Sequence, residues 1–197
     1  MSGASDTNSK NNMRVLVVDD EPAVAKSLVR LLESLGYGVR TATSAEEGLT
    51  LAAGQPFAAI LTSIEFDHAD IYRDLEHIKD AFRKFMEIID PKGFLLVEFS
   101  DKNTKDVINK AQCEVETYGF SEQADWQVAD YRFADGHGQF TLNHKGKEVG
   151  RFHLPMIGRH NILNSAAVAA MALKCGLSTD AVAEGLKSFK GIKRRQE

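Results

Sequence analysis

Residues 14–22 of this 197-residue chain are Arg14-Val15-Leu16-Val17-Val18-Asp19-Asp20-Glu21-Pro22. A short β-branched run that ends in acidic residues is typical of a buried strand whose carboxyl end opens into a loop. Apolar residues then recur at helical spacing as far as Leu35, and Gly36 follows at the expected end of that helix. The sequence therefore predicts a strand over 14–18 followed by a helix over 23–35.

The same alternation of strand and helix continues downstream. Strands are expected over 37–42 and 57–62, with a helix over 45–53 between them. Ser44, followed three residues later by Glu47, is a capping box for the start of that helix. Strand, helix, strand, helix and strand in succession predict a parallel sheet with right-handed crossovers.

The remaining chain predicts more of both element types. Strands are expected over 94–99, 113–118, 126–133, 139–143 and 148–154, and helices over 71–89, 105–111, 161–175 and 180–189. The strands over 126–154 alternate apolar and polar residues, which is typical of antiparallel strands with one exposed face. We therefore expect an α/β fold, a three-layer parallel sheet with helices on both faces plus a small antiparallel β region. It forms a single domain over 13–197, after a disordered leader over 1–12 that is rich in Ser, Asn and Lys.

Composition excludes several classes of function. The chain is 43% hydrophobic and has a net charge of −4, so the basic surface that nucleic acids require is not expected. No apolar run approaches the roughly 18–20 residues of a membrane-spanning helix. Cys113 and Cys175 lie too far apart in sequence to form a metal-type pair. We therefore expect a cytoplasmic protein that binds neither nucleic acid nor membrane.

The first third of the chain resembles the first half of a response-regulator receiver domain. The resemblance rests on residues 15–22, 35–37, 45–49 and 56–61. It implies a flavodoxin-like front half of the sheet, in which Asp19 and Asp20 help to hold Mg²⁺ beside an acceptor aspartate after the third strand. Ser63 stands where that aspartate is expected, and a serine hydroxyl cannot form an acyl phosphate. Phosphoryl acceptance is therefore not expected.

Residues 62–197 resemble the rear part of the ATP-binding domain of Mur ligases, the ADP-forming amide ligases of peptidoglycan biosynthesis. Three segments account for the resemblance: Thr62-Ser63-Ile64-Glu65-Phe66-Asp67-His68-Ala69-Asp70-Ile71-Tyr72, Gly158-Arg159-His160-Asn161-Ile162-Leu163-Asn164 and Phe189-Lys190-Gly191-Ile192-Lys193-Arg194-Arg195. The first is most similar to the murein peptide ligase branch of the family. The resemblance implies that His68 holds Mg²⁺, that Asn161 and Asn164 face the adenine of ATP, and that Arg195 reaches a phosphate. Asparagine offers a base edge both donor and acceptor, and guanidinium suits bidentate phosphate contact.

The sequence also departs from the Mur ligase pattern. Mur ligases bind the phosphates of ATP with a Gly-rich loop at a helix N-terminus, and here Asp19-Asp20-Glu21-Pro22 occupies the first strand–helix loop. Two carboxylates repel a triphosphate, although Mg²⁺ can bridge them. The family's further acidic metal ligand and both flanking domains are not recognisable. Complete amide synthesis is therefore not expected.

Together the two resemblances predict a chimera joined within residues 59–65. The leading hypothesis is a Mur-ligase-type domain fragment that binds ATP and Mg²⁺, fused to a receiver half and without complete catalysis. A receiver-like interaction module that binds a protein partner is the second hypothesis. The third is an inactive scaffold, produced either by natural recombination or by design.

Overall fold

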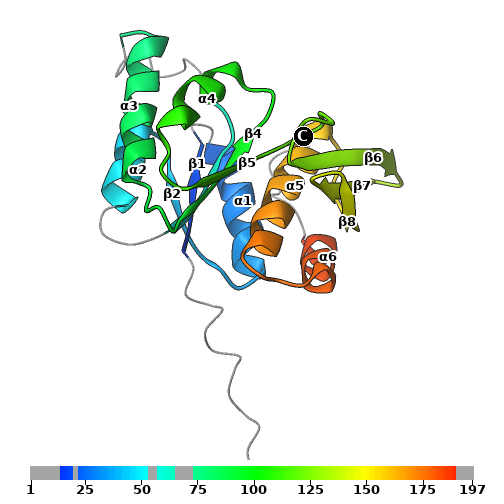
Figure 1. The fold of residues 1–197 in the computed structure, drawn as a ribbon. Coiled ribbons are helices and arrows are strands. Elements are labelled where there is room, and N and C mark those ends of the chain that lie inside the picture. Colours follow the sequence, from blue (N-terminus) through cyan, green and yellow to red (C-terminus); the bar gives the residue numbers. More distant parts are fainter. Residues whose placement is uncertain (1–13, 20–21, 53–56, 65–72, 190–197) are drawn as a thin grey trace, which may run out of the picture.

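The computed structural model describes residues 14–19, 22–52, 57–64 and 73–189 (Figure 1). Its strands are β1 (Arg14–Val18), β2 (Gly38–Ala42), β3 (Phe57–Leu61), β4 (Phe94–Glu98), β5 (Glu114–Gly119), β6 (Trp126–Ala134), β7 (His137–His144) and β8 (Lys147–Leu154). Its helices are α1 (Pro22–Ser34), α2 (Ala45–Ala52), α3 (Leu75–Ile88), α4 (Lys102–Val107), α5 (Arg159–Lys174) and α6 (Thr179–Ser188), with a 3₁₀ turn, η1 (Ile108–Lys110). Each strand and helix expected from the sequence is present.

The described strands form one sheet in the order β2-β1-β3-β4-β5-β6-β7-β8. Strands β1 to β5 are parallel, and their order places a topological switch point between β1 and β3. The pairing of β5 with β6 is short, because only Tyr118↔Trp126 and Gly119↔Gln127 are in register. Strands β6 to β8 are antiparallel and continue the same sheet, so the expected antiparallel region is an extension of the sheet.

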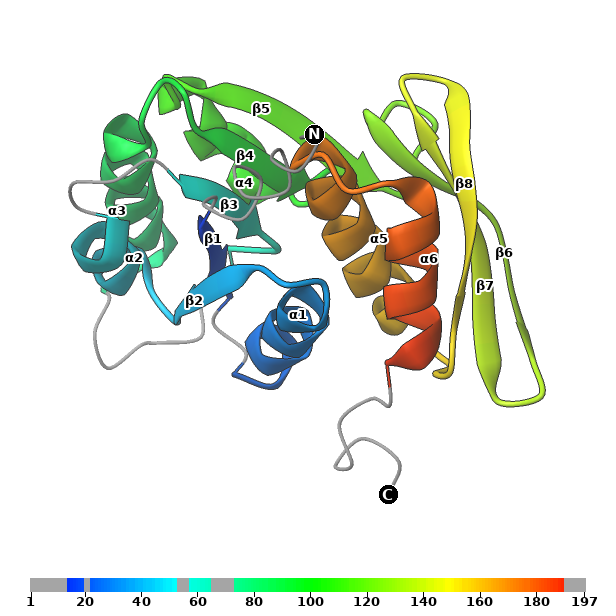
Figure 2. The same ribbon diagram turned by 90° about the horizontal axis from the view of Figure 1, so that it is seen from below.

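Helices cover both faces of the parallel strands, which confirms the predicted three-layer architecture. Along β1, Val15 and Val17 belong to a buried cluster shared with α1, α5 and α6, whereas Leu16 and Val18 belong to a cluster shared with α3. Successive side chains of a strand point to opposite faces, so burial on both faces explains why the sequence of β1 is continuously apolar. Figure 2 shows α5 and α6 lying between the parallel strands and strands β6–β8.

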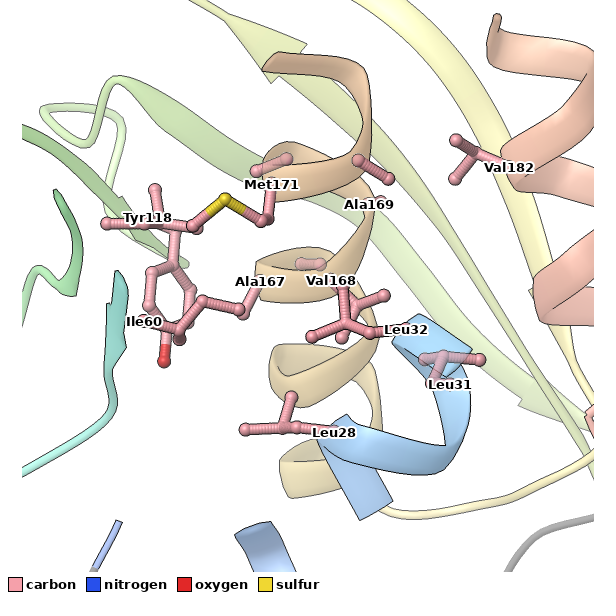
Figure 3. Packing of buried hydrophobic residues seen from close by; sticks show 14 of the residues in the cluster. Leu28, Leu31, Leu32, Ile60, Tyr118, Ala167, Val168, Ala169, Met171 and Val182 are labelled. Carbon is pink, nitrogen blue, oxygen red and sulfur yellow. The ribbon is translucent and has the colours of Figure 1, made fainter. Parts of the chain in front are cut away.

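Residues 14–61 and residues 73–189 share one hydrophobic core. Figure 3 shows Leu28 and Leu32 of α1 beside Val168 of α5, and all three are buried. The Tyr37 hydroxyl donates a hydrogen bond of 3.2 Å to the carbonyl oxygen of Ala172. Side chains of α1 and α5, which lie on either side of the proposed junction at residues 59–65, therefore pack in one core.

Two helix starts differ from the sequence prediction. Helix α4, which connects β4 to β5, begins at Lys102 instead of residue 105. The Asp101 side chain caps it by accepting from the Asn103 amide at 2.8 Å. Helix α3 begins at Leu75, where the Asp74 side chain accepts from the His77 amide at 2.8 Å. Residue 71, the predicted start, lies outside the described residues. In both cases a capping aspartate determines the start more closely than the apolar periodicity did.

Candidate functional site

The carboxyl ends of the parallel strands form the candidate site, because ligands of open α/β sheets bind there, near the switch point. Asp19 directly follows β1 and is buried, with 3% of its surface exposed. The Thr62 hydroxyl, which follows β3, donates to Asp19 Oδ2 at 2.7 Å. Ser63 comes next and is partly buried. Asp19 and Ser63 therefore lie at the strand ends where the sequence placed them, and their functional roles stay predictions.

Sequence reasoning missed two further carboxylates at this edge, Glu98 at the end of β4 and Asp101 in the loop that follows it. Oε2 of the buried Glu98 accepts hydrogen bonds from the Ser100 amide at 3.0 Å, the Ser100 hydroxyl at 2.7 Å and the Asp101 amide at 2.9 Å. Asp101 Oδ2 in turn accepts from the Ile64 amide and the Thr104 hydroxyl, both at 2.7 Å. The loops after β3 and β4 are therefore tied together by Asp101.

Tyr118 of β5 is buried near this edge, and the charges of Asp19, Glu98 and Asp101 affect its pKa. Its pKa is raised well above the ordinary value, first by burial and then by the charges of Glu98, Asp19 and Asp101. The Tyr118 hydroxyl therefore lies within electrostatic range of all three carboxylates. We call Asp19, Glu98 and Asp101 the acidic edge.

The predicted Mg²⁺ site is only partly represented in this structure. Within the described ranges, no group of three or more His, Cys, Asp or Glu residues is arranged to hold a metal ion. Asp19 offers one carboxylate, and carboxylates are suitable ligands for Mg²⁺. The other two predicted ligands, Asp20 and His68, lie outside the described residues. The described side chains alone therefore do not make a Mg²⁺ site.

The start of α5 holds the two asparagines that the sequence singled out. Gly158 precedes the helix with φ of 108°, a backbone conformation that favours glycine. The Asn161 side chain donates from Nδ2 to the carbonyl oxygen of Ile157 at 2.7 Å. In the described part of the chain, the Asn164 side chain makes no hydrogen bond. The two amides are three residues apart and therefore share one side of the helix.

The hydrogen bond of Asn161 fixes the orientation of its amide. Because Ile157 contributes a carbonyl oxygen, the NH₂ end of the Asn161 amide must face it, and the Oδ1 end is turned the other way. Asn161 is thus held as a fixed acceptor. Asn164 is not held in this way by the described residues, so its amide can turn to offer either a donor or an acceptor.

The start of α5 and the acidic edge are neighbours along the sheet. The Arg159 guanidinium lies over the Phe120 ring, 4.2 Å from its centroid, and Phe120 directly follows β5. A Cβ on Gly119, at the end of β5, would lie 3.3 Å from Glu98 Oε1. The structure therefore brings Asn161 and Asn164 to the same edge of the sheet as Asp19. Arg195 lies outside the described residues.

Comparisons with known proteins match this architecture. The family model of the Mur ligase middle domain matches residues 10–172 of the chain. The UDP-N-acetylmuramate–L-alanine ligase of Caldanaerobacter subterraneus subsp. tengcongensis is 34% identical over 143 residues, which are 72% of this chain and 31% of that protein. The chain thus spans about a third of the length of this curated relative.

Solved structures of Mur ligases share the fold. A UDP-N-acetylmuramate:L-alanyl-gamma-D-glutamyl-meso-diaminopimelate ligase from Neisseria meningitides superposes with a TM-score of 0.75 at 23% identity, over 92% of this chain and 67% of that one. MurF ligase from Thermotoga maritima, in complex with ADP, superposes with a TM-score of 0.72 at 15% identity, over 92% and 49%. Among the described helices, none is long and apolar enough to cross a membrane.

Proposed function

The chain belongs to the Mur ligase family, and from this premise we propose that it binds ATP at the carboxyl edge of its sheet without completing amide synthesis. The observation that supports this most is the fixed acceptor of Asn161 at the start of α5. An acceptor held in one orientation suits the exocyclic amino group of adenine. The MurF ligase structure from Thermotoga maritima contains ADP, which supports a nucleotide as the ligand class.

The proposed contacts divide between the base, the phosphates and the metal. Asn161 and Asn164 contact the adenine, and Arg195 contacts a phosphate. Asp19, with Asp20 and His68, holds Mg²⁺, which when bound would offset the charge of the phosphates. We also propose a cytoplasmic location, where ATP is available.

The first strand–helix connection argues against complete catalysis. In a phosphate-binding loop, backbone N–H groups at a helix N-terminus contact the phosphates. Here α1 begins at Pro22, which has no N–H, and the preceding strand ends next to the buried carboxylate of Asp19. Where a phosphate-binding loop has backbone N–H donors, this chain therefore has the Asp19 carboxylate, which is a hydrogen-bond acceptor. We therefore propose that the chain binds nucleotide without transferring its γ-phosphoryl group.

We also propose that residues 14–61 derive from a receiver domain. The residues quoted from this part of the sequence support that origin, as does the strand order 2-1-3-4-5, which is that of flavodoxin-like sheets. The Mur ligase middle-domain model extends over these residues as well, so the family match itself shows no boundary at residues 59–65. With serine at position 63, this part acts as a structural half of the sheet and as a surface for a protein partner, without phosphorylation.

Base selectivity tests the proposed function. The chain is expected to bind ATP roughly tenfold or more tightly than ITP, whose carbonyl oxygen would face Asn161 Oδ1 without a proton between them. In Asn161→Ala this preference should fall towards unity. Asn143→Ala is the matched control, because the Asn143 amide also donates a hydrogen bond, to Gln127 Oε1 at 3.1 Å, but lies on β7. Equal binding of ATP and ITP by the unmodified chain would contradict the proposed base contact.

A further inference from the structure

Arg159, the first residue of α5, lies against two aromatic rings. Its guanidinium is 4.2 Å from the centroid of the Phe120 ring and 5.9 Å from the centroid of the Tyr131 ring. The centroids of the two rings are 5.1 Å apart, with 57° between the ring planes. Within the described ranges the guanidinium forms no ion pair, so its attraction to the rings is the interaction that holds it. We call Phe120, Tyr131 and Arg159 the aromatic clamp.

A bulge in β6 accounts for the position of Tyr131. The register of β6 against β7 shifts between Ala129 and Arg132. Asp130 and Tyr131 therefore lie opposite a single residue of β7, and Asp130 has φ of 46°, a left-handed conformation that aspartate tolerates better than most residues. A bulge changes the direction of a side chain, and here Tyr131 reaches Phe120, which directly follows β5. The clamp thus joins β5, β6 and α5.

The clamp holds the turn that carries Asn161. Ile162 is fully buried and anchors the helix that follows, but no side chain over residues 155–161 is buried. The hydrogen bond from Asn161 Nδ2 to the Ile157 carbonyl oxygen lies within this turn. It fixes the Asn161 amide relative to the turn and leaves open where the turn sits on the sheet. Arg159 lies between these two residues in sequence, and its contact with the rings fixes that position.

We propose that the aromatic clamp positions the Asn161 acceptor and thereby sets the selectivity of the site for a 6-aminopurine over a 6-oxopurine nucleotide. The inference rests on the proposed function and specifies the ligand class of the same site. Phe120 and Tyr131 are positioning residues, because they act through Arg159. A fixed acceptor rejects a carbonyl oxygen because the two acceptors face each other without a proton. In a turn that can shift, the acceptor moves aside and water satisfies both oxygens.

Calorimetric titration of the full chain with ATP and with ITP, both with Mg²⁺, gives the ratio of the two affinities. Phe120→Leu removes the face of a ring, and Arg159→Met removes the charge from an exposed position. Each should lower the preference for ATP by roughly threefold or more. Phe120→Tyr retains a ring and should retain the preference. Because both changes break the same contact, the double variant should lower the preference no further than either single variant does.

Lys105→Met is the matched control. Lys105 Nζ also lies over an aromatic ring, that of Phe99, 4.1 Å from its centroid, but Lys105 belongs to α4. Its loss removes a comparable cation–ring contact without touching the turn that carries Asn161. The ratio of ATP to ITP affinity in Lys105→Met should equal that of the unmodified chain.

The outcomes separate this inference from the proposed function. If the unmodified chain prefers ATP and the ratio in Phe120→Leu and Arg159→Met equals that in Lys105→Met, the inference is wrong and the proposed function stands. The same holds if both affinities fall together in these variants, because the clamp would then have a structural role alone. If the unmodified chain binds the two nucleotides equally, or binds neither, the proposed base contact is overturned and the inference with it.

Discussion

Replacing Leu32 with alanine is expected to lower the free energy of unfolding by about 3 kcal/mol. Leu32 has 0% of its surface exposed and belongs to the buried cluster that includes Val168 and Ala172 of α5. Truncation removes buried methyl groups and leaves a cavity between α1 and α5, which the surrounding helices cannot fully close. The measurement is urea-induced unfolding of the unmodified and the Leu32→Ala chains.

The same experiment tests whether residues 13–197 form a single domain. The only tryptophan of the chain, Trp126, lies buried on β6, far along the sequence from Leu32. If the core is continuous, Leu32→Ala shifts the unfolding midpoint of Trp126 fluorescence and of far-ultraviolet circular dichroism equally. Ile88→Ala, at a position that is 42% exposed, should change the stability by no more than about 0.5 kcal/mol. Two separate transitions, with Trp126 unaffected by Leu32→Ala, would show that the two parts fold independently.

Replacing Glu116 with alanine is expected to destabilise the chain by about 3 kcal/mol. The Glu116 side chain is 3% exposed, and it accepts hydrogen bonds from Trp126 Nε1 at 2.6 Å and Lys145 Nζ at 2.8 Å. Lys174 Nζ and His144 Nε2 each lie 3.2 Å from its oxygens. The Glu116 carboxylate on β5 thus contacts side chains of β6, the β7–β8 turn and α5. These contacts matter because β5 and β6 are in register at only two residue pairs. Its removal leaves the buried indole N–H without an acceptor.

Glu114→Ala is the matched control for this prediction. Glu114 lies two residues away on the same strand and contacts the same Lys174 Nζ, at 2.7 Å, but its side chain is 55% exposed. An exposed ion pair contributes little, so its removal should cost no more than about 0.5–1 kcal/mol in urea-induced unfolding. Similar losses in Glu114→Ala and Glu116→Ala would show that the buried network does not stabilise the sheet.

The stabilisation by Glu116 should depend on pH in a defined window. Burial alone would raise the pKa of the Glu116 carboxyl, but hydrogen bonds from Lys145, Trp126 and Lys174 outweigh burial and lower the pKa to about 2 from an ordinary 4.5. A carboxyl whose pKa is lower in the folded state stabilises that state fully above its unfolded pKa. The stability difference between the unmodified chain and Glu116→Gln should therefore be constant above pH 5 and decrease as the pH falls towards 2. A difference that is independent of pH across this window would contradict the assignment.

Most strands and helices were predictable because their buried apolar residues recur at a regular spacing in the sequence. Strand β1 is buried on both faces and is therefore continuously apolar. Ser178 caps α6, because its side chain accepts from the Ala181 amide at 3.3 Å. The start of α4 was not predictable from periodicity, because the helix is short and its start depends on the Asp101 side chain. The sequence therefore predicts the layers well and the ends of short helices poorly.

The candidate site was predictable only where a residue directly follows a strand or starts a helix. Asp19 directly follows β1, Ser63 lies two residues after β3, and Asn161 lies in the first turn of α5. The acidic edge was missed because it depends on a contact between Asp101 and the Ile64 amide, 37 residues apart in sequence. The Glu116 network was missed for the same reason, since its partner Lys174 is 58 residues away. Contacts between residues so far apart in sequence produce no periodic pattern from which they could be predicted.

The central claim is that the start of α5 still recognises a nucleotide although the phosphate-binding loop is replaced by Asp19-Asp20-Glu21-Pro22. Calorimetric titration of the chain with ATP and Mg²⁺, with Asn164→Ala in parallel, tests it most directly. Asn109→Ala, an exposed asparagine in η1, is the control. We expect saturable binding in the roughly micromolar range for the unmodified chain and the control, and no binding for Asn164→Ala. An absence of heat from an unmodified chain that unfolds cooperatively would contradict the claim, because the fold would then be retained without the nucleotide site.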